Sequence, residues 1–289
     1  MKEIYILIII WVLISIYLFY VTRENFNKNV YKKCTNSESK IPKIIWQTYK
    51  TKKLPIDAMN ARQTWIKKNP EWEVNLFDDD DIEKYILEYW DDRMYKFYKA
   101  LPIGVMKADL WRYLILTTHG GVYADVDSIC KIPIETWTSD LNIKNKENIL
   151  VFGLENDTNF CQWSMLSTPN HDAMNYICKY ILLNFEKNGI DIRKEHIVHI
   201  TTGPSIWTDA IRSYLQIDQK INTKYILDMY NNNEINNDEI IILPYESFNI
   251  TYVQNLYGSQ NFGDNYVKWI DEIKILQQKV DKTNKLINK

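Results

Sequence analysis

Two aspartates separated by one residue, Asp125 and Asp127, are the side chains in this sequence best suited to chemistry. They end a short β-branched and aromatic run, Val122 to Val126, which predicts a buried strand. Alternation along a strand would turn both carboxylates to one side and Val126 to the other. Two acids on one side at a strand end predict a site for a hard divalent cation, and such a cation can hold a diphosphate.

The residues before this strand predict a helix that positions the pair. Apolar or small residues recur at helical spacing and indicate one buried face: Leu110, Tyr113, Leu114 and Thr117. Gly120 and Gly121 supply the left-handed conformations that end a helix. Within the helix, Asp109 and Arg112 lie three residues apart and share a face. On that spacing alone they form an intrahelical ion pair, and a role in a site is the alternative.

Four blocks in this order carry a family resemblance. The central block, A-D-x-x-R-Y followed by G-G-V-Y-x-D-x-D, resembles the core of the DXD glycosyltransferases related to yeast initiating α-mannosyltransferases and inositol-phosphoceramide mannosyltransferases, grouped as glycosyltransferase family 32. Upstream, residues 41–50 (I-P-K-I-I-W-Q-T-Y-K) and 69–80 (N-P-E-W-E-V-N-L-F-D-D-D) extend the resemblance. Residues 202–211 (T-G-P-S-I-W-T-D-A-I) complete it. Four ordered blocks across residues 41–250 are more specific than one DXD.

The resemblance implies a fold and a reaction. The fold would be α/β, a GT-A type, Rossmann-like mixed sheet flanked by helices. The reaction would be retaining transfer of a hexose, mannose or galactose, from a GDP- or UDP-hexose donor to a glycan or lipid acceptor. Asp127 would bind Mn²⁺ or Mg²⁺ directly, and Asp125 would bind it through water or contact the donor. Front-face attack needs no dedicated protein base, and the sequence nominates none.

The same resemblance implies the donor-binding residues. Asp109, Arg112 and Tyr123 would contact the nucleotide or sugar. Trp46 would stack on the nucleobase or pack in the core, and many mannosyltransferase-like members have His there. Thr202 and Gly203 would form a turn whose backbone N–H groups face an anion or a sugar hydroxyl. Near the carboxy terminus, where members commonly have a His, Gln254 or Asn255 stands, so the sequence assigns no third metal ligand.

Two further functions remain open. The segment D-V-D-S resembles the first motif of aspartyl-nucleophile phosphatases, in which Asp125 would be the nucleophile and Asp127 the general acid. That motif normally stands near the start of its domain, whereas about eighty residues of domain precede it here. The other alternative is a non-catalytic, membrane-bound glycan-binding protein. Intact acids at both motifs favour an enzyme over it.

The chain divides into three segments. Residues 4–21 form an almost unbroken apolar run without charges, long enough to cross a bilayer as a helix, so residues 1–21 are predicted to be a transmembrane anchor. Residues 22–40 are predicted to be a polar stem and residues 41–289 the catalytic domain. Within that domain the patterns predict a helix at 56–68, strands at 149–153 and 240–243, and an amphipathic helix at 266–287. Basic residues after the run would place the domain in the cytosol. The family implies the opposite, a type II protein of Golgi or ER-type membranes, or of a host or viral membrane, and we follow the family.

Composition excludes some classes. A net charge of −2 gives no general basis for nucleic-acid binding. The four cysteines (Cys34, Cys130, Cys161 and Cys178) show no C-x-x-C spacing, so they are disulfide-bonded in a lumen or buried as thiols. The acidic run at residues 78–81 predicts a capped helix start, not a metal site. Sequons at Asn156 and Asn249 matter only if the domain is lumenal.

Overall fold

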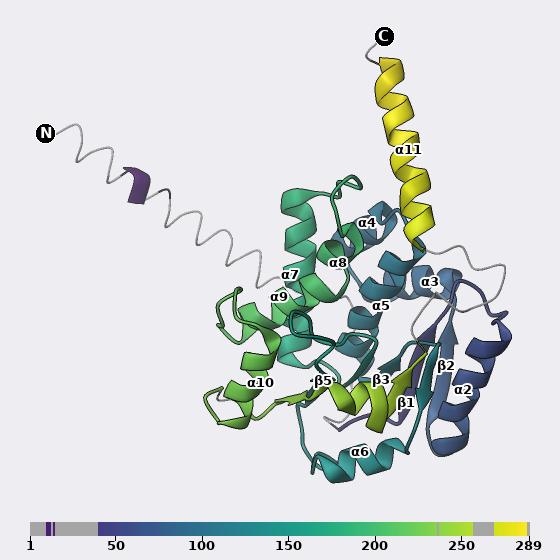
Figure 1. The fold of residues 1–289 in the computed structure, drawn as a ribbon, viewed down its shortest axis with the longest axis vertical. Coiled ribbons are helices and arrows are strands. Elements are labelled where there is room, and N and C mark those ends of the chain that lie inside the picture. Colours follow the sequence, from purple (N-terminus) through teal and green to yellow (C-terminus); the bar gives the residue numbers. More distant parts are fainter. Residues whose placement is uncertain (1–9, 13, 15–39, 236, 257–268, 288–289) are drawn as a thin grey trace, which may run out of the picture.

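A six-stranded mixed sheet runs through the middle of the domain (Figure 1). The computed structural model describes residues 10–12, 14, 40–235, 237–256 and 269–287. The strand order is β2-β1-β3-β6-β5-β7. Only β6 is antiparallel to its neighbours, so the other five strands point the same way and end at one edge of the sheet. The strands are β1 Ile44–Thr48, β2 Glu73–Phe77, β3 Gly121–Ala124, β5 Leu150–Gly153, β6 Ser164–Ser167 and β7 Ile240–Leu243.

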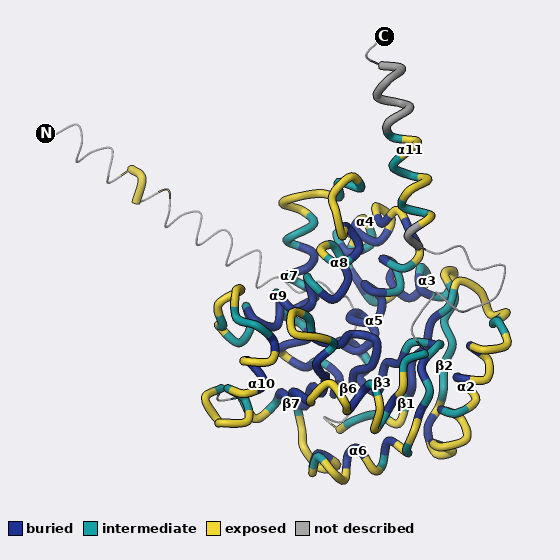
Figure 2. Tube along the Cα trace, in the orientation of Figure 1, coloured by how far each residue is buried: buried dark blue, intermediate teal, exposed yellow. Residues whose placement is uncertain are grey.

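Helices cover both faces of this sheet. They are α2 Ile56–Lys68, α3 Asp79–Tyr89, α4 Asp92–Ala100, α5 Gly104–His119, α6 Ile134–Asp140, α7 Asp172–Asn188, α8 Ile197–Thr201, α9 Pro204–Tyr214, α10 Thr223–Asn231 and α11 Trp269–Ile287, with a π-helix, η1, at Ser247–Thr251. Strand residues alternate between two cores. Tyr123 belongs to the core beneath α5, whereas Val122 and Ala124 belong to the core beneath α2 and α6. The sheet is therefore buried on both faces, as the buried colour in Figure 2 shows.

Most elements expected from the sequence are present. The predicted helix at 56–68 and the predicted strand at 240–243 have those bounds, and the acidic run begins α3. Asp78 caps that helix in a reciprocal capping box with Asp81, which confirms the structural interpretation of the run. Gly120 (φ 63°) ends α5 and Gly121 (φ 93°) begins β3, both in the left-handed region as predicted. A side chain at Gly121 would also meet the Ile44 carbonyl oxygen at 2.5 Å.

A second, two-stranded sheet holds the carboxy-terminal segment against the main domain. Strand β4 (Ser128–Cys130) pairs antiparallel with β8 (Val253–Asn255). Helix α11 projects from the body (Figure 1), and its side chains Ile273 and Leu276 pack on the main core. The expected amphipathic helix is thus present and contacts the domain.

Two expectations concern residues that the structure leaves largely undescribed. The predicted anchor and stem lie outside the described residues, except for residues 10–12, 14 and 40. Among the residues that the structure does describe, no helix combines the length and apolar character needed to cross a bilayer. Cys130, Cys161 and Cys178 are free, buried thiols, and Cys34 lies outside the described part.

Candidate active site

Helix α5 supplies the buried positive charge of the site. Arg112 is 4% exposed, and its Nη1 lies 2.9 Å from Oδ1 of Asp109, which is 2% exposed. The two residues form the intrahelical pair that their spacing predicted. Because neither group reaches water, the pair differs from a surface ion pair, and removing one partner would leave the other charge buried and uncompensated.

The same guanidinium reaches across to the DXD motif. Arg112 Nη2 donates to Oδ1 of Asp125 at 3.1 Å, and the Tyr123 hydroxyl donates to the same oxygen at 2.6 Å. The guanidinium carbon also lies 4.9 Å from the centre of the Tyr123 ring. Asp125 keeps 28% of its side chain exposed. One of its oxygens is therefore fixed by two donors while the carboxylate still faces solvent.

A turn, and not strand alternation, places the two acids. Strand β3 ends at Ala124, so the prediction that it extends to Val126 is wrong. The Ser128 N–H and hydroxyl both donate to the Asp125 carbonyl oxygen, which closes a tight turn over Asp125 to Ser128. The Asp125 N–H donates to the Trp163 carbonyl oxygen at 2.9 Å, which ties the start of this turn to the sheet.

Asp127 is half-buried in this turn beside Asp125. Burial, and then the negative charge of Asp125, raise the pKa of Asp127 to about 7. The charge of Arg112 acts in the opposite direction but does not offset burial and the charge of Asp125. Carboxylate oxygens of this kind suit Mn²⁺ or Mg²⁺. Within the described ranges no group of three His, Cys, Asp or Glu side chains converges as a complete metal site. The two carboxylates fit a divalent cation that takes its other ligands from water or a substrate phosphate.

A polar network behind the ion pair holds Asp109 in place. Gln162 Nε2 donates to Asp109 Oδ1 at 3.2 Å, and the Thr202 hydroxyl lies 3.5 Å from its Oδ2. The Tyr113 hydroxyl contacts both Gln162 and the Thr202 carbonyl oxygen. Burial nonetheless raises the pKa of Asp109 to about 7, with Arg112 acting in the opposite direction. The sequence assigned Tyr113 to the core, and the resemblance placed residues 159–167, which include Gln162, toward the acceptor. Neither indicated a contact with Asp109, because only the fold brings these residues together.

The Thr202–Gly203 turn contributes in a different way from the one predicted. The N–H groups of Thr202 and Gly203 both donate to the Val198 carbonyl oxygen, at 3.1 and 2.9 Å. Pro204 has no N–H. The expectation that this turn presents backbone donors to an anion is therefore wrong, because the preceding short helix α8 uses them. Thr202 is fully buried and reaches the site through its hydroxyl on Asp109.

Trp46 lies in the core beside the predicted donor pocket. It is 6% exposed, and its indole Nε1 donates to the Gly120 carbonyl oxygen at 2.8 Å. Its ring packs edge-on against Phe77 and His119. Because Gly120 precedes β3, the indole leans away from the edge where the DXD turn lies. The packing favours the core interpretation that the sequence left open, and base stacking stays a prediction.

Glu155 is a further acid at this edge that the sequence analysis missed. It follows β5 as Asp125 follows β3, and these strands end at the same edge of the sheet. Burial raises the pKa of Glu155 to about 7, and the charges of Arg112 and Asp125 both act on it. The available signal was an acid two residues beyond the predicted strand at 149–153, with Leu154 between them.

Strand β8 brings the carboxy-terminal segment to the DXD turn. Asn255 pairs with Ser128, and the Leu256 N–H donates to the Asp127 carbonyl oxygen at 3.2 Å. Gln254 instead accepts from Lys131 Nζ at 3.2 Å. Of the two residues proposed to stand in the place of the family's His, Asn255 is thus the one opposite Ser128 in the DXD turn.

Comparison with known proteins agrees with this geometry. Residues 55–144 match the family described as glycosyltransferase sugar-binding region containing DXD motif. The chain is 30% identical over 210 residues to an initiation-specific alpha-1,6-mannosyltransferase of Candida albicans, covering 62% of this chain and 54% of that protein. It is 25% identical to inositol phosphoceramide mannosyltransferase 2 of Schizosaccharomyces pombe, covering 75% of this chain and 65% of that one.

The matches to curated relatives cover only part of their length. The chain spans about half the length of the initiation-specific mannosyltransferases from Candida albicans and Schizosaccharomyces pombe that it matches. Among solved structures it is similar to PaToxG Glycosyltransferase, with a TM-score of 0.46 and 17% identity, over 87% of this chain and 96% of that one.

Proposed function

The chain belongs to the DXD-containing glycosyltransferase family of the initiation-specific and inositol phosphoceramide mannosyltransferases, and we propose that it transfers a hexose from a nucleotide-sugar to a glycan or lipid acceptor. The donor is a GDP- or UDP-hexose, with mannose or galactose as the sugar. The reaction retains configuration and uses Mn²⁺ or Mg²⁺. The sheet, with five strands ending at one edge, supports assignment to the GT-A type.

The observation that carries the proposal is the arrangement of charge around Asp125. A buried arginine and a buried tyrosine hold one of its oxygens, and the second acid of the motif lies in the same turn. A nucleotide diphosphate needs positive charge where negative charge develops as the sugar leaves. Arg112 supplies one fixed positive charge at this edge of the sheet, and Asp125 and Asp127 form a place for a second.

The residues of the chain have separable roles in this proposal. Asp127, with Asp125 beside it, would hold the divalent cation, which when bound acts as a Lewis acid on the diphosphate. Tyr123 and Arg112 orient Asp125. Asp109 orients Arg112, and Gln162 and Thr202 in turn orient Asp109 through the bonds described above. Direct contact of Asp109 and Arg112 with the nucleotide or sugar stays a prediction from the resemblance, because both side chains are almost fully buried.

The phosphatase alternative is not favoured. The family match and the mannosyltransferase relatives both indicate sugar transfer. A non-catalytic protein would have no need to keep a buried arginine between two carboxylates, because a buried ion pair is a weak source of stability.

Membrane attachment is part of the proposal. Residues 4–21 anchor the protein, and the catalytic domain lies in the lumen of a Golgi or ER-type compartment. The apolar run and the family support this placement, against the basic residues that follow the run.

Replacement of Asp127 tests the proposed function. Asp127→Asn keeps the shape but loses the charge, so metal-dependent cleavage of GDP- or UDP-sugars should fall by at least about 100-fold, since a Lewis-acid metal contributes several kcal/mol. Thermal unfolding should be nearly unchanged. Asp80→Asn, in the acidic run at the start of α3, is the matched control and should keep full activity. Undiminished activity in a chelator, or in Asp127→Asn, would refute the metal mechanism.

A further inference from the structure

A cavity of 810 Å³ opens at the edge of the sheet that carries the DXD turn. It is bounded by the loop after β5, the first turns of α10 and the segment after β7. Because β3, β5 and β7 run parallel, the three strands end at the same edge. In the order β3-β6-β5, β5 is two strands from β3, which places the loop roughly 10 Å from the DXD turn.

Glu155 lines this cavity and also interacts electrostatically with charged residues of the site. Its Oε2 is buried with no hydrogen-bond partner among the described residues. The charges of Arg112 and Asp125 act on its pKa, so the carboxylate lies within electrostatic reach of both. A buried carboxylate oxygen without a donor is costly unless a ligand supplies one. Glu155 therefore lies between the DXD turn and the cavity with an unused acceptor.

The wall of the cavity is fixed by bonds from behind. Thr223 donates its N–H to the Asp157 carbonyl oxygen and its hydroxyl to the Asn156 carbonyl oxygen, at 3.0 and 2.6 Å. Arg212 Nη2 donates to the Thr158 carbonyl oxygen at 3.2 Å. The loop after β5 thus needs no ligand to keep its shape, and Oε2 of Glu155 remains available to one.

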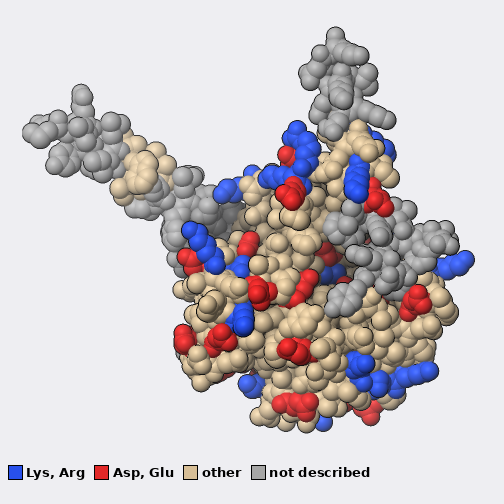
Figure 3. All heavy atoms as spheres, viewed as in Figure 1, with Lys and Arg blue, Asp and Glu red and all other residues tan. Residues whose placement is uncertain are grey.

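The lining is rich in hydrogen-bond acceptors and negative charge. Four carboxylates and one ammonium group face the cavity, with one aromatic ring: Glu155, Asp157, Asp228, Glu246, Lys224 and Tyr245. Asp and Glu side chains also lie over the centre and left of the face shown in Figure 3. Carboxylates accept hydrogen bonds from sugar hydroxyls, whereas they repel a phosphate.

We propose that this cavity binds the acceptor, and that the acceptor is a neutral glycan rather than a phosphate-bearing one. The inference rests on the proposed transferase function and names its second substrate. The cavity volume lies within the ~300–1,000 Å³ common for small-ligand sites. Glu155 accepts a hydrogen bond from an acceptor hydroxyl at the end nearest the DXD turn. Because the lining carries more carboxylates than ammonium groups, its net negative charge repels phosphate groups on the acceptor.

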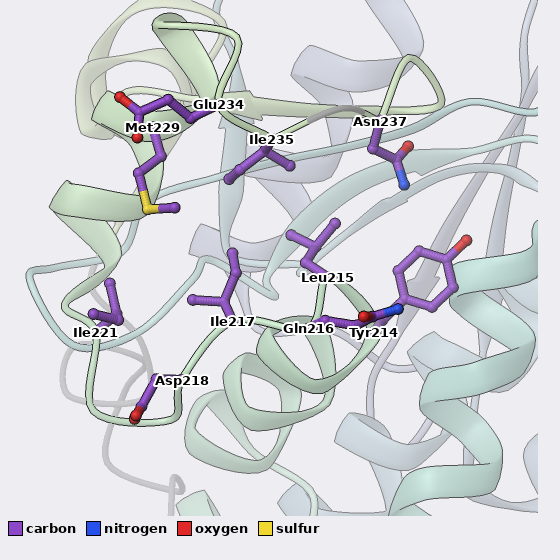
Figure 4. Close-up of a pocket in the computed structure, with 10 residues that line it drawn as sticks. All are labelled: Tyr214, Leu215, Gln216, Ile217, Asp218, Ile221, Met229, Glu234, Ile235 and Asn237. Carbon is purple, nitrogen blue, oxygen red and sulfur yellow. The ribbon is translucent and has the colours of Figure 1, made fainter.

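A second cavity, of 740 Å³, provides a matched control. Figure 4 shows it between the end of α9 and the segment after α10, lined mostly by apolar side chains such as Leu215, Ile217 and Ile235. Its Asp218 is exposed and accepts from the Lys220 N–H at 2.8 Å. Asp218→Asn preserves that acceptor and removes one charge away from the edge of the sheet.

The test measures glycan binding by calorimetry on the full chain in detergent, without donor. The probes are α-mannotriose and a mannotriose monophosphate at low ionic strength. The parent should bind the neutral probe more tightly. In the double variant Asp228→Asn/Glu246→Gln, the preference for the neutral probe should shrink by about tenfold, because each removed charge would lie about 7 Å from the phosphate in water. High salt should shrink it in the parent. Asp218→Asn should leave it unchanged.

Several results would overturn the inference. They are tighter or equal binding of the phosphorylated probe by the parent, an unchanged preference in the double variant, or an equal shift in Asp218→Asn. Cleavage of nucleotide-sugars without acceptor is measured on the same samples. If the parent cleaves none, the proposed function fails, and the acceptor assignment fails with it even where glycan binds. If cleavage is present and the binding preference is absent, only the acceptor assignment fails.

Discussion

Replacing Tyr123 by phenylalanine removes one oxygen atom from the site and leaves its ring in place. The ring is fully buried in the core beneath α5, and the Arg112 guanidinium carbon lies 4.9 Å from its centre. The hydroxyl that is lost donates to Asp125 Oδ1 at 2.6 Å. After the change, Arg112 Nη2 still donates to this oxygen at 3.1 Å.

The expected loss follows from the exposure of Asp125. A hydrogen bond to a charged group contributes about 1.5–3 kcal/mol. Since 28% of the Asp125 side chain is exposed, water can replace part of the lost bond, and the lower end of that range applies. About 1.5 kcal/mol corresponds to a roughly tenfold fall in kcat/KM for nucleotide-sugar cleavage. A looser Asp125 should also raise the Mn²⁺ concentration needed for half-maximal activity.

The assay follows nucleotide release from GDP- and UDP-sugars across a Mn²⁺ titration, with urea unfolding on the same samples. Tyr85→Phe is the control, because Tyr85 is also a buried tyrosine whose hydroxyl donates within the core, to the Leu114 carbonyl oxygen at 3.0 Å. It should lower stability and leave kcat/KM unchanged. If Tyr123→Phe keeps full activity, or loses no more than Tyr85→Phe, Tyr123 does not position Asp125.

Three further outcomes are expected. Trp46→Ala should lower the free energy of unfolding by about 3–5 kcal/mol and leave donor affinity per folded molecule unchanged, as for a core residue. A selective loss of donor affinity, by about 1–3 kcal/mol, would establish base stacking instead. Burial raises the pKa of Asp109 to about 7 from its ordinary 3.8, so the folded protein keeps a proton that the unfolded chain releases. As pH rises from about 4 to 7, this group should therefore lower the free energy of unfolding by up to about 4 kcal/mol. Asp109→Asn should reduce the pH dependence in urea unfolding without abolishing it, because burial raises the pKa of Asp127 and Glu155 to about 7 as well. A slope equal to the parent's would contradict the prediction. In eukaryotic cells Asn156 or Asn249 should acquire a glycan, and the lumenal placement is wrong if neither does and protease outside sealed vesicles digests the domain.

Local patterns were sufficient for the elements of the domain. Helical spacing at 56–68 and the glycine pair at 120–121 act through short-range sterics and backbone hydrogen bonds, which neighbouring residues settle by themselves. The capping box at Asp78 is likewise a contact between residues three apart. For the same reason the sequence correctly assigned the acidic run to a capped helix start.

Local patterns failed where a distant backbone group competes for a donor. The N–H groups of the Thr202–Gly203 turn were expected to face a ligand, but α8 places the Val198 carbonyl oxygen within their reach. For Trp46 the sequence left base stacking and core packing open, and the residue before β3 offers its indole N–H the Gly120 carbonyl oxygen, 74 residues away in sequence. Sequence spacing holds no information on which of two partners lies closer in the fold.

The sequence by itself singled out Asp109, Arg112, Asp125 and Asp127 as candidate site residues, since they stand in motifs of fixed spacing. Only the tertiary structure decided how they act together. The turn at Asp125, the hydroxyl of Tyr123 and the charge of Arg112 converge because β3 ends beside the buried face of α5. Glu155 joins them because two parallel strands separated by one antiparallel strand end at the same edge. Burial then sets the charge state of these groups, and burial is a property of the packed chain and not of any segment of it.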